Sequence, residues 1–282
     1  MKATLESVLK DHFNVDLSQA EVTLQKDGLT NSNYIVSQGS DKYVVRISNE
    51  DSKCLGINRN AELEAMSAIA DLGIGAEIMA YSVEKEYMIT KYIDGLKWSD
   101  EDMKIPSNIK KVGNLIKKVH NGKGISYEFS PYRDIENRVN FAKENHLDLP
   151  DNVEDLLVKL HKIEEERELD NSIQIGLCHN DPFSNNYIDD GNLRLIDWEY
   201  AGMGDIYFDL ACICMPLSDA ERDLFLTEYF GEWDEKEVAG IEQMAYVAYF
   251  WNAMWAVVQS RLKDTEQDYK AIAKYLFSQL HI

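Results

Sequence analysis

Two carboxylates and one amide in the second half of the chain have the types and spacing that phosphoryl transfer requires. Asp181 and Asn186 belong to the run His179-Asn-Asp-Pro-Phe-Ser-Asn-Asn186, and Asp197 ends an apolar run shortly after it. Phosphoryl transfer needs a carboxylate that accepts the proton of the nucleophile, oxygen ligands for Mg²⁺ and cations on the phosphates. Asp181 is therefore the candidate base. Asn186 and Asp197 are candidate metal ligands, because hard cations prefer oxygen donors.

Each of these residues alone also has a structural interpretation. Asp181-Pro can form a turn, Asn186 can turn the backbone, and Asp197 can cap a following helix. The segment Asp189-Asp-Gly-Asn192 lies between two apolar runs, which is typical of a β-hairpin whose second arm ends at Asp197. The combination of loop, hairpin and terminal aspartate favours a catalytic interpretation over the structural ones.

The first third of the chain is expected to be rich in strands. After a short helix, alternating β-branched and aromatic residues between turn formers predict strands, and apolar periodicity predicts one helix. The expected strands are Val22–Lys26, Asn33–Ser37, Lys42–Ile47, Glu77–Ser82 and Glu86–Tyr92, and the expected helix is Asn58–Leu72. Asp94-Gly95 breaks the pattern, and we place a lobe boundary there.

The remainder reads as mostly helical, apart from the hairpin. Helical periodicity is expected over Ile105–Asn121, Tyr132–Asn145, Val153–Leu169 and Val238–Leu262, with a last helix from Asp264 onward. This pattern predicts an α+β fold with a small antiparallel N-terminal lobe (1–94) and a larger helical lobe (95–282). The cleft between two such lobes is the expected ligand site.

Composition limits the possible partners. The chain has 282 residues, a formal net charge of −21 and 45% hydrophobic residues. Such acidity disfavours nucleic acid and anionic membranes and favours a cationic small molecule. The apolar runs are shorter than a membrane span, and the four cysteines form no CxxC pair. We therefore expect a cytoplasmic protein, with a monomer favoured and a dimer as the alternative.

The catalytic motif resembles that of a known family. The His179–Asn186 run, followed by Ile196-Asp-Trp-Glu-Tyr200 and by Asp209-Leu210, is similar to motifs of the choline/ethanolamine kinases, within the aminoglycoside phosphotransferase and protein-kinase-like superfamily. The resemblance implies a two-lobed kinase-like fold with a catalytic hairpin. It also implies that His179 braces the catalytic loop and that Asp209 anchors the catalytic core. His120, at the end of an amphipathic helix, is expected to act as a C-terminal cap partner.

The first lobe carries matching nucleotide-binding motifs. The segment Gly28–Tyr34 resembles the loop that covers ATP phosphates in choline kinases, which implies phosphate contacts from Gly28, Thr30 and Asn31. Arg46 occupies the place of the kinase phosphate-binding lysine, and its forked guanidinium suits phosphate.

A helix of the first lobe is expected to orient this arginine. The resemblance implies that Glu62 holds Arg46, with Glu64 as the alternative, and that residues 88–95 form the hinge beside adenine. Structural alternatives remain at this point: a surface ion pair for Arg46 and a solvated helix face for Glu62.

Aromatic residues near the C-terminus suggest a site for a quaternary ammonium. Trp251 and Trp255 are four residues apart, hence on one helix face, and Tyr269 follows on the next helix. Choline kinases resemble this arrangement, but their two tryptophans are three residues apart, which leaves Asn252 at the position of the first one. Glu199 is a further candidate contact to the substrate. An ordinary core role is the alternative for both tryptophans.

Together these features predict an ATP- and Mg²⁺-dependent kinase that phosphorylates the hydroxyl of choline to give phosphocholine. The alternatives are a kinase of another small alcohol, namely ethanolamine, thiamine, a methylthio-sugar or an aminoglycoside. A nucleotide-binding regulator without turnover is a further alternative, although the presence of Asp181, Asn186 and Asp197 argues against it.

Overall fold

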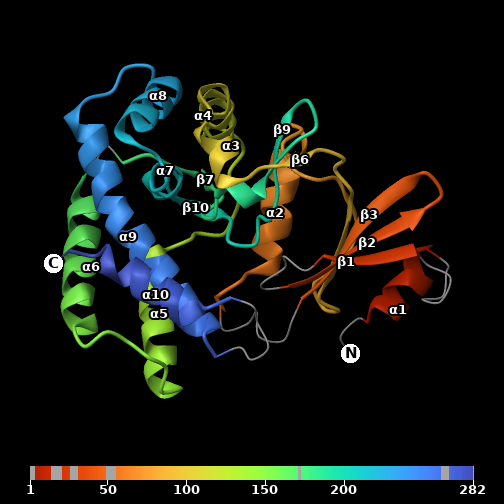
Figure 1. Ribbon diagram of the computed structural model, residues 1–282, viewed down its shortest axis with the longest axis horizontal. Helices are drawn as coiled ribbons and strands as arrows, with labels where there is room; N and C mark the ends of the chain where they lie inside the picture. Colours follow the sequence, from red (N-terminus) through yellow and green to blue (C-terminus); the bar gives the residue numbers. More distant parts are fainter. Residues whose placement is uncertain are drawn as a thin grey trace.

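The fold has two lobes that differ in secondary structure. A computed structural model describes residues 4–13, 21–25, 31–48, 55–170, 173–261 and 267–281. An antiparallel sheet lies at one end of the molecule and a group of helices at the other, with α2 between them (Figure 1). This arrangement confirms the predicted α+β fold with a sheet-containing lobe and a helical lobe.

The first lobe is built on a five-stranded antiparallel sheet. Its strand order is β1-β2-β3-β5-β4. The strands are β1 (Glu21–Gln25), β2 (Asn31–Gln38), β3 (Asp41–Ser48), β4 (Ile78–Ser82) and β5 (Tyr87–Lys91). The short helix α1 (Leu5–Val8) and the π-helical turn η1 (Leu9–Phe13) pack against the sheet, with Val8, Leu9 and Phe13 in a core shared with Val45 and Ile89.

Helix α2 (Arg59–Ala70) carries two polar residues, Arg59 and Glu62, in its first turn. Asn58 caps its N-terminus by accepting hydrogen bonds from the backbone amides of Asn60 and Ala61. Ala65 and Ile69 are buried in the main core. The helix is therefore fixed by a cap at one end and by apolar packing along its length, close to the predicted bounds.

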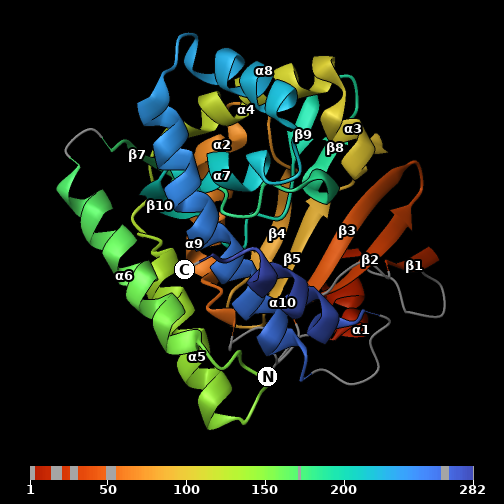
Figure 2. The same ribbon diagram turned by 60° about the vertical axis from the view of Figure 1, so that its left-hand side comes forward.

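The second lobe consists mainly of helices around a large apolar core. The helices of this lobe make up the larger part of the molecule (Figure 2). They are α3 (Asp100–Lys104), α4 (Pro106–His120), α5 (Pro131–Glu144), α6 (Val153–Leu169), α7 (Tyr207–Cys214), α8 (Asp219–Phe230), α9 (Glu235–Gln259) and α10 (Tyr269–Ser278). Among the described helices, none combines the length and the apolar composition needed to cross a membrane.

Short strands position the candidate catalytic residues within the helical lobe. β8 (Tyr187–Asp189) and β9 (Leu193–Leu195) form the predicted hairpin, and β6 (Leu96–Lys97) pairs with β8. A side chain at Gly95 would place its Cβ 2.7 Å from the carbonyl oxygen of Asp189, so only glycine allows this approach. β7 (Ile175–Cys178) pairs with β10 (Gly202–Asp205). The boundary predicted at Asp94-Gly95 lies directly before β6, the strand that pairs with β8 of the hairpin.

The last helix begins later than expected. α10 starts at Tyr269, with Asp268 as its cap, and not at Asp264, which lies outside the described residues. Asp268 accepts a hydrogen bond from the amide of Ala271 and so sets the helix start. α7 had no expected bounds, because seven of its eight residues are buried and the helix therefore lacks amphipathic periodicity.

Candidate active site

One buried carboxylate binds the backbone of the loop that follows β7. Asp209, on α7, is fully buried and accepts hydrogen bonds from the amides of His179 (2.8 Å) and Asn180 (2.7 Å). Asn180 has a φ of 65°, a left-handed conformation that costs energy outside glycine and is common at functional sites. Asp209 therefore stabilises a strained turn, in agreement with an anchoring role.

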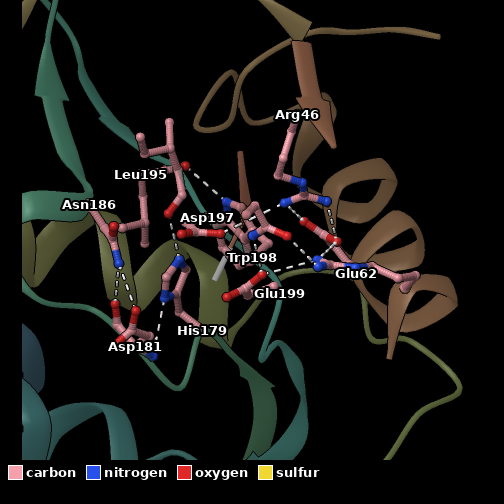
Figure 3. Close-up of polar contacts among 12 residues, drawn as sticks. Arg46, Glu62, His179, Asp181, Asn186, Leu195, Asp197, Trp198 and Glu199 are labelled. Atoms are coloured by element: carbon pink, nitrogen blue, oxygen red, sulfur yellow. Dashed lines mark hydrogen bonds and ion pairs between the residues drawn. The ribbon is translucent and has the colours of Figure 1, made fainter. Parts of the chain in front are cut away.

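His179 braces the same loop from within. Its Nδ1 accepts a hydrogen bond from the amide of Asp181 (3.2 Å), and its Nε2 donates to the carbonyl oxygen of Ile196 (3.0 Å) (Figure 3). Burial lowers the pKa of His179, although the charge of Asp209 opposes this change. A neutral imidazole with the hydrogen on Nε2 fits both contacts. The ring thus connects the segment before Asp181 with the segment before Asp197.

Asp181 and Asn186 face each other across the catalytic loop. Asn186 donates from Nδ2 to the main-chain oxygen of Asp181 (2.8 Å) and to its carboxylate oxygen Oδ2 (2.9 Å). Asn186 Oδ1 is not part of this contact and accepts a long hydrogen bond from Asn185 Nδ2 (3.4 Å). Burial, together with the nearby charge of Asp197, raises the pKa of Asp181 well above its usual range. Asp181 is thus a partly buried carboxylate whose raised pKa favours uptake of a proton, the step that a general base performs.

Asp197 follows β9 in a second left-handed conformation, with a φ of 68°. Its side chain keeps 40% of its surface exposed, so a cation in the cleft can reach it. Partial loss of water around the carboxylate in the cleft and the charge of Glu199 raise the pKa of Asp197 to about 7, whereas Arg46 acts in the opposite direction. A carboxylate beside an amide oxygen is a donor set that suits Mg²⁺.

Arg46 and Glu62 form a bidentate ion pair close to Asp197. Arg46 Nη1 and Nη2 lie 2.5 Å and 2.6 Å from the two carboxylate oxygens of Glu62. Arg46 Nη1 also lies 3.8 Å from Asp197. Burial raises the pKa of Glu62, but the charges of Arg46 and Arg59 outweigh it, so the pKa is lowered and the carboxylate stays ionised. Glu64 instead accepts hydrogen bonds from Ser126, so Glu62 is the partner of Arg46.

These residues line one cavity of about 550 Å³ between the lobes. Its wall includes Asn31, Arg46, Asp181, Asn186 and Asp197. The predicted hinge also contributes to the wall, through Lys91, Tyr92 and Ile93. The sequence-predicted catalytic, metal-binding and phosphate-binding residues that the structure describes therefore meet in one cleft. Gly28 and Thr30 lie outside the described residues.

Trp251 and Trp255 both line the cleft, but Trp251 is buried and contacts other side chains of the protein. Only 1% of Trp251 is exposed, and its indole N–H donates to Asp134 Oδ2 (3.1 Å). The guanidinium carbon of Arg138 lies 4.1 Å from the centre of the Trp251 ring. A cation of the protein thus already occupies a face of Trp251.

Trp255 is the more accessible of the two rings. It is partly buried and lines the cleft together with Glu199, Tyr200 and Asn252. Tyr269 packs edge-to-face against Trp255, with ring centres 5.7 Å apart, but it is 3% exposed and is not among the described residues that line the cleft. Tyr269 thus supports Trp255, and its direct contact with a substrate stays a prediction.

Comparison with known proteins places this arrangement in a family. Residues 21–246 match the model of the family described as "Phosphotransferase enzyme family". The chain belongs to this family. It is 27% identical over 214 residues to the protein LicA of Haemophilus influenzae, a match that covers 72% of this chain and 60% of that protein.

Two solved structures have the same fold as this phosphotransferase family member. One is a choline/ethanolamine kinase family protein from Mesorhizobium loti, with a TM-score of 0.80 and 21% identity over 97% of this chain and 91% of that chain. The other is the choline kinase LicA of Streptococcus pneumoniae, with a TM-score of 0.79 and 23% identity over 98% of this chain and 100% of that chain. The two-lobed kinase-like fold that the resemblance implied is thereby confirmed.

The prediction for His120 was wrong. Its ring is buried and does not cap α4: Nε2 donates to Asp209 (3.0 Å), and Nδ1 accepts from the hydroxyl of Tyr229 (2.6 Å). His120 therefore supports the anchor of the catalytic loop of the phosphotransferase. Asp205, in β10, forms an ion pair with Arg167 at 2.6 Å.

Sequence reasoning also missed Arg59. Its guanidinium contacts Asn31, Glu62 and Glu199. The arginine stands three residues before Glu62, but spacing alone does not reveal partners from other elements.

Proposed function

We propose that the protein transfers the γ-phosphoryl group of ATP to the hydroxyl of choline and forms phosphocholine. The observation that carries this proposal is the common position of Asp181, Asp197 and Arg46 in one interlobe cleft that also holds an aromatic residue, Trp255. A carboxylate base, a metal carboxylate and a phosphate-binding cation are the groups that phosphoryl transfer uses. We call the end of the cleft near Trp255 the head-group end. Glu199 lines it, and its negative charge attracts a cationic alcohol.

Asp181 orients the hydroxyl and accepts its proton. Burial raises the pKa of Asp181, which favours proton uptake during the transfer. Asn186 fixes the side chain by donating to Oδ2, so Oδ1 is the oxygen that meets the hydroxyl. Arg46, held by Glu62, neutralises charge on the phosphates. Catalysis then consists of positioning and charge neutralisation.

Asn186 Oδ1 and Asp197 would hold the metal ion of the nucleotide. When it is bound, Mg²⁺ neutralises charge on the transferred group and on the leaving phosphates. The donor set fits this ion, because both groups offer oxygen and both line the cleft.

Ethanolamine is the second candidate substrate, and a specific observation favours it. Arg138 occupies a face of Trp251, so fewer rings remain for a trimethylammonium group. Asn252 donates from Nδ2 to the carbonyl oxygen of Ala248 (2.9 Å), which leaves its Oδ1 as an acceptor. A primary ammonium needs acceptors for its N–H groups, whereas a quaternary one needs aromatic surface.

A coupled assay of ADP release with choline, ethanolamine, thiamine and kanamycin tests the proposal. We expect the highest kcat/KM with choline, together with a requirement for Mg²⁺. A higher kcat/KM with ethanolamine would replace choline by the second candidate. ATP binding without turnover on any of the four alcohols would support a nucleotide-binding regulator instead and would contradict the proposed activity.

A further inference from the structure

One arginine behind the cleft connects three residues of the cleft wall. Arg59 Nη1 lies 3.0 Å from Glu62 Oε2 and 3.0 Å from Glu199 Oε2, and its Nη2 donates to Asn31 Oδ1 at 2.7 Å. Asn31 Nδ2 in turn donates to the same Glu199 oxygen at 2.8 Å. We call Asn31, Arg59, Glu62 and Glu199 the Arg59 network.

The network joins the two lobes. Asn31 begins β2 and Arg59 begins α2, whereas Glu199 follows β9 in the helical lobe, two residues after Asp197. Figure 3 places Glu199 between the catalytic loop and the Arg46–Glu62 pair. The contacts therefore connect the nucleotide side of the cleft with the segment that carries a metal-side carboxylate.

The network is buried and charged, which makes its geometry energetically important. Asn31, Glu62 and Glu199 are at most 5% exposed, and the Arg59 side chain is 14% exposed. Buried hydrogen bonds between ionised groups are shorter and stronger than neutral ones, and a buried carboxylate without its partner is costly. Glu199 therefore holds one position only while Arg59 and Asn31 bind it.

Arg59 is not itself among the described residues that line the cleft, whereas Asn31, Glu62 and Glu199 are. We propose that Arg59 is a positioning residue, which sets Glu199 for the alcohol and Asn31 for the nucleotide without contacting either ligand. This inference rests on the proposed phosphotransfer. The planar fork of arginine fits the role, because lysine cannot hold several acceptors in fixed directions.

A double-mutant cycle tests whether Arg59 acts through Glu199. We expect Arg59→Gln and Glu199→Gln each to lower kcat/KM for the alcohol by about 10- to 100-fold, the loss of one or two charge-assisted hydrogen bonds. The double variant should be no worse than the more damaged single variant, because both changes break the same contact. Fold-losses that multiply would overturn the proposal.

The nucleotide side needs its own cycle, with Arg59→Gln and Asn31→Ala and the dissociation constant of ATP with Mg²⁺ as the readout. We again expect the double variant to match the weaker-binding single variant. A merely structural arginine would lower the melting temperature and the active fraction, but it would leave KM for the alcohol and ATP affinity per folded molecule unchanged. That result would also overturn the proposal.

Two further variants keep the outcome unambiguous. Arg133→Gln removes an exposed arginine that pairs with Glu136 and Glu164, and it should change neither kcat nor KM. Should Arg59→Gln fail to fold, Arg59→Lys takes its place, with a smaller expected loss in the same two cycles. Absence of turnover by the wild type would defeat the proposed function, and the ATP-binding cycle would still decide the role of Arg59.

Discussion

The catalytic loop and the head-group end of the cleft are built in different ways. Around Asp181, backbone groups and buried side chains fix each polar atom: Asp209 holds two amides, and His179 connects two segments. At the head-group end, side chains from α5 and α9 meet, and the protein uses part of the aromatic surface for its own Arg138. Backbone contacts thus position the candidate catalytic residues, and side-chain packing positions the candidate substrate contacts.

This difference explains why the loop around Asp181 indicates the type of reaction, whereas the residues near Trp255 do not identify the alcohol. A loop fixed by buried hydrogen bonds tolerates few alternatives, because each lost partner leaves an unsatisfied group. A pocket between helices changes its lining with single substitutions that keep the fold. We therefore expect substitutions in the catalytic loop to affect kcat and those near Trp255 to affect KM.

Asp181→Ala tests the catalytic side most strongly. Without the carboxylate, nothing accepts the proton of the hydroxyl, and we expect kcat to fall by roughly 100- to 10,000-fold, the usual contribution of a general base. Steady-state kinetics with ATP and choline provide the measurement. The exposed Asp223→Ala on α8 is the control and should keep wild-type kcat. Robust turnover by a folded Asp181→Ala protein would remove the residue from the mechanism.

Asp209→Ala tests whether the loop depends on its buried anchor. The change leaves the amides of His179 and Asn180 and the ring of His120 without their acceptor. Unsatisfied buried groups cost about 1–3 kcal/mol each, so we expect the free energy of unfolding to fall by roughly 3 kcal/mol or more. Urea denaturation measures this loss. An unfolding midpoint equal to that of the wild type would contradict the anchoring role.

Trp255→Ala tests the other side of the comparison. Loss of a cation–π contact of about 0.5–2 kcal/mol should raise KM for choline roughly 2- to 30-fold, while KM for ATP stays the same. Steady-state titrations of both substrates separate the two constants.

The neighbouring Trp251→Phe is the matched control for that measurement. It removes the indole hydrogen bond to Asp134, so it should lower stability and leave KM for choline nearly unchanged. If Trp251→Phe raised this KM more than Trp255→Ala, the roles of the two rings would be reversed.

Much of the catalytic side could be predicted because its signals are local. The spacing of Asp181 and Asn186 and the Asp-Gly turn lie within one short segment, and β8 and β9 form the expected hairpin. The family resemblance implied the Arg46–Glu62 contact, with Glu64 as the alternative, and the structure has the ion pair with Glu62 at 2.5 Å.

Other features could not be predicted, because their partners lie far apart in the chain. Arg59 contacts a residue 140 positions away, and the ring of His120 turns inward toward Asp209 and Tyr229, which no helical pattern indicates. The four-residue spacing of Trp251 and Trp255 was consistent with one helix face. However, α9 is buried on most sides, so spacing could not separate the cleft from the core.

The pH dependence of stability gives a smaller effect that again separates the two regions. Burial lowers the pKa of His179 below the ordinary value of about 6.5, so the unfolded chain takes up this proton first as the pH falls. The stability that depends on neutral His179 is therefore complete above about pH 6.5 and decreases below it. We expect the difference in unfolding free energy between the wild type and His179→Gln to shrink from pH 7 to pH 5, as measured by urea denaturation at each pH. The same difference should stay constant for Trp255→Ala, whose ring packs against Tyr269. A difference for His179→Gln that grows as the pH falls would mean that the folded protein holds a charged imidazole, and the bracing contacts would then need the opposite hydrogen assignment.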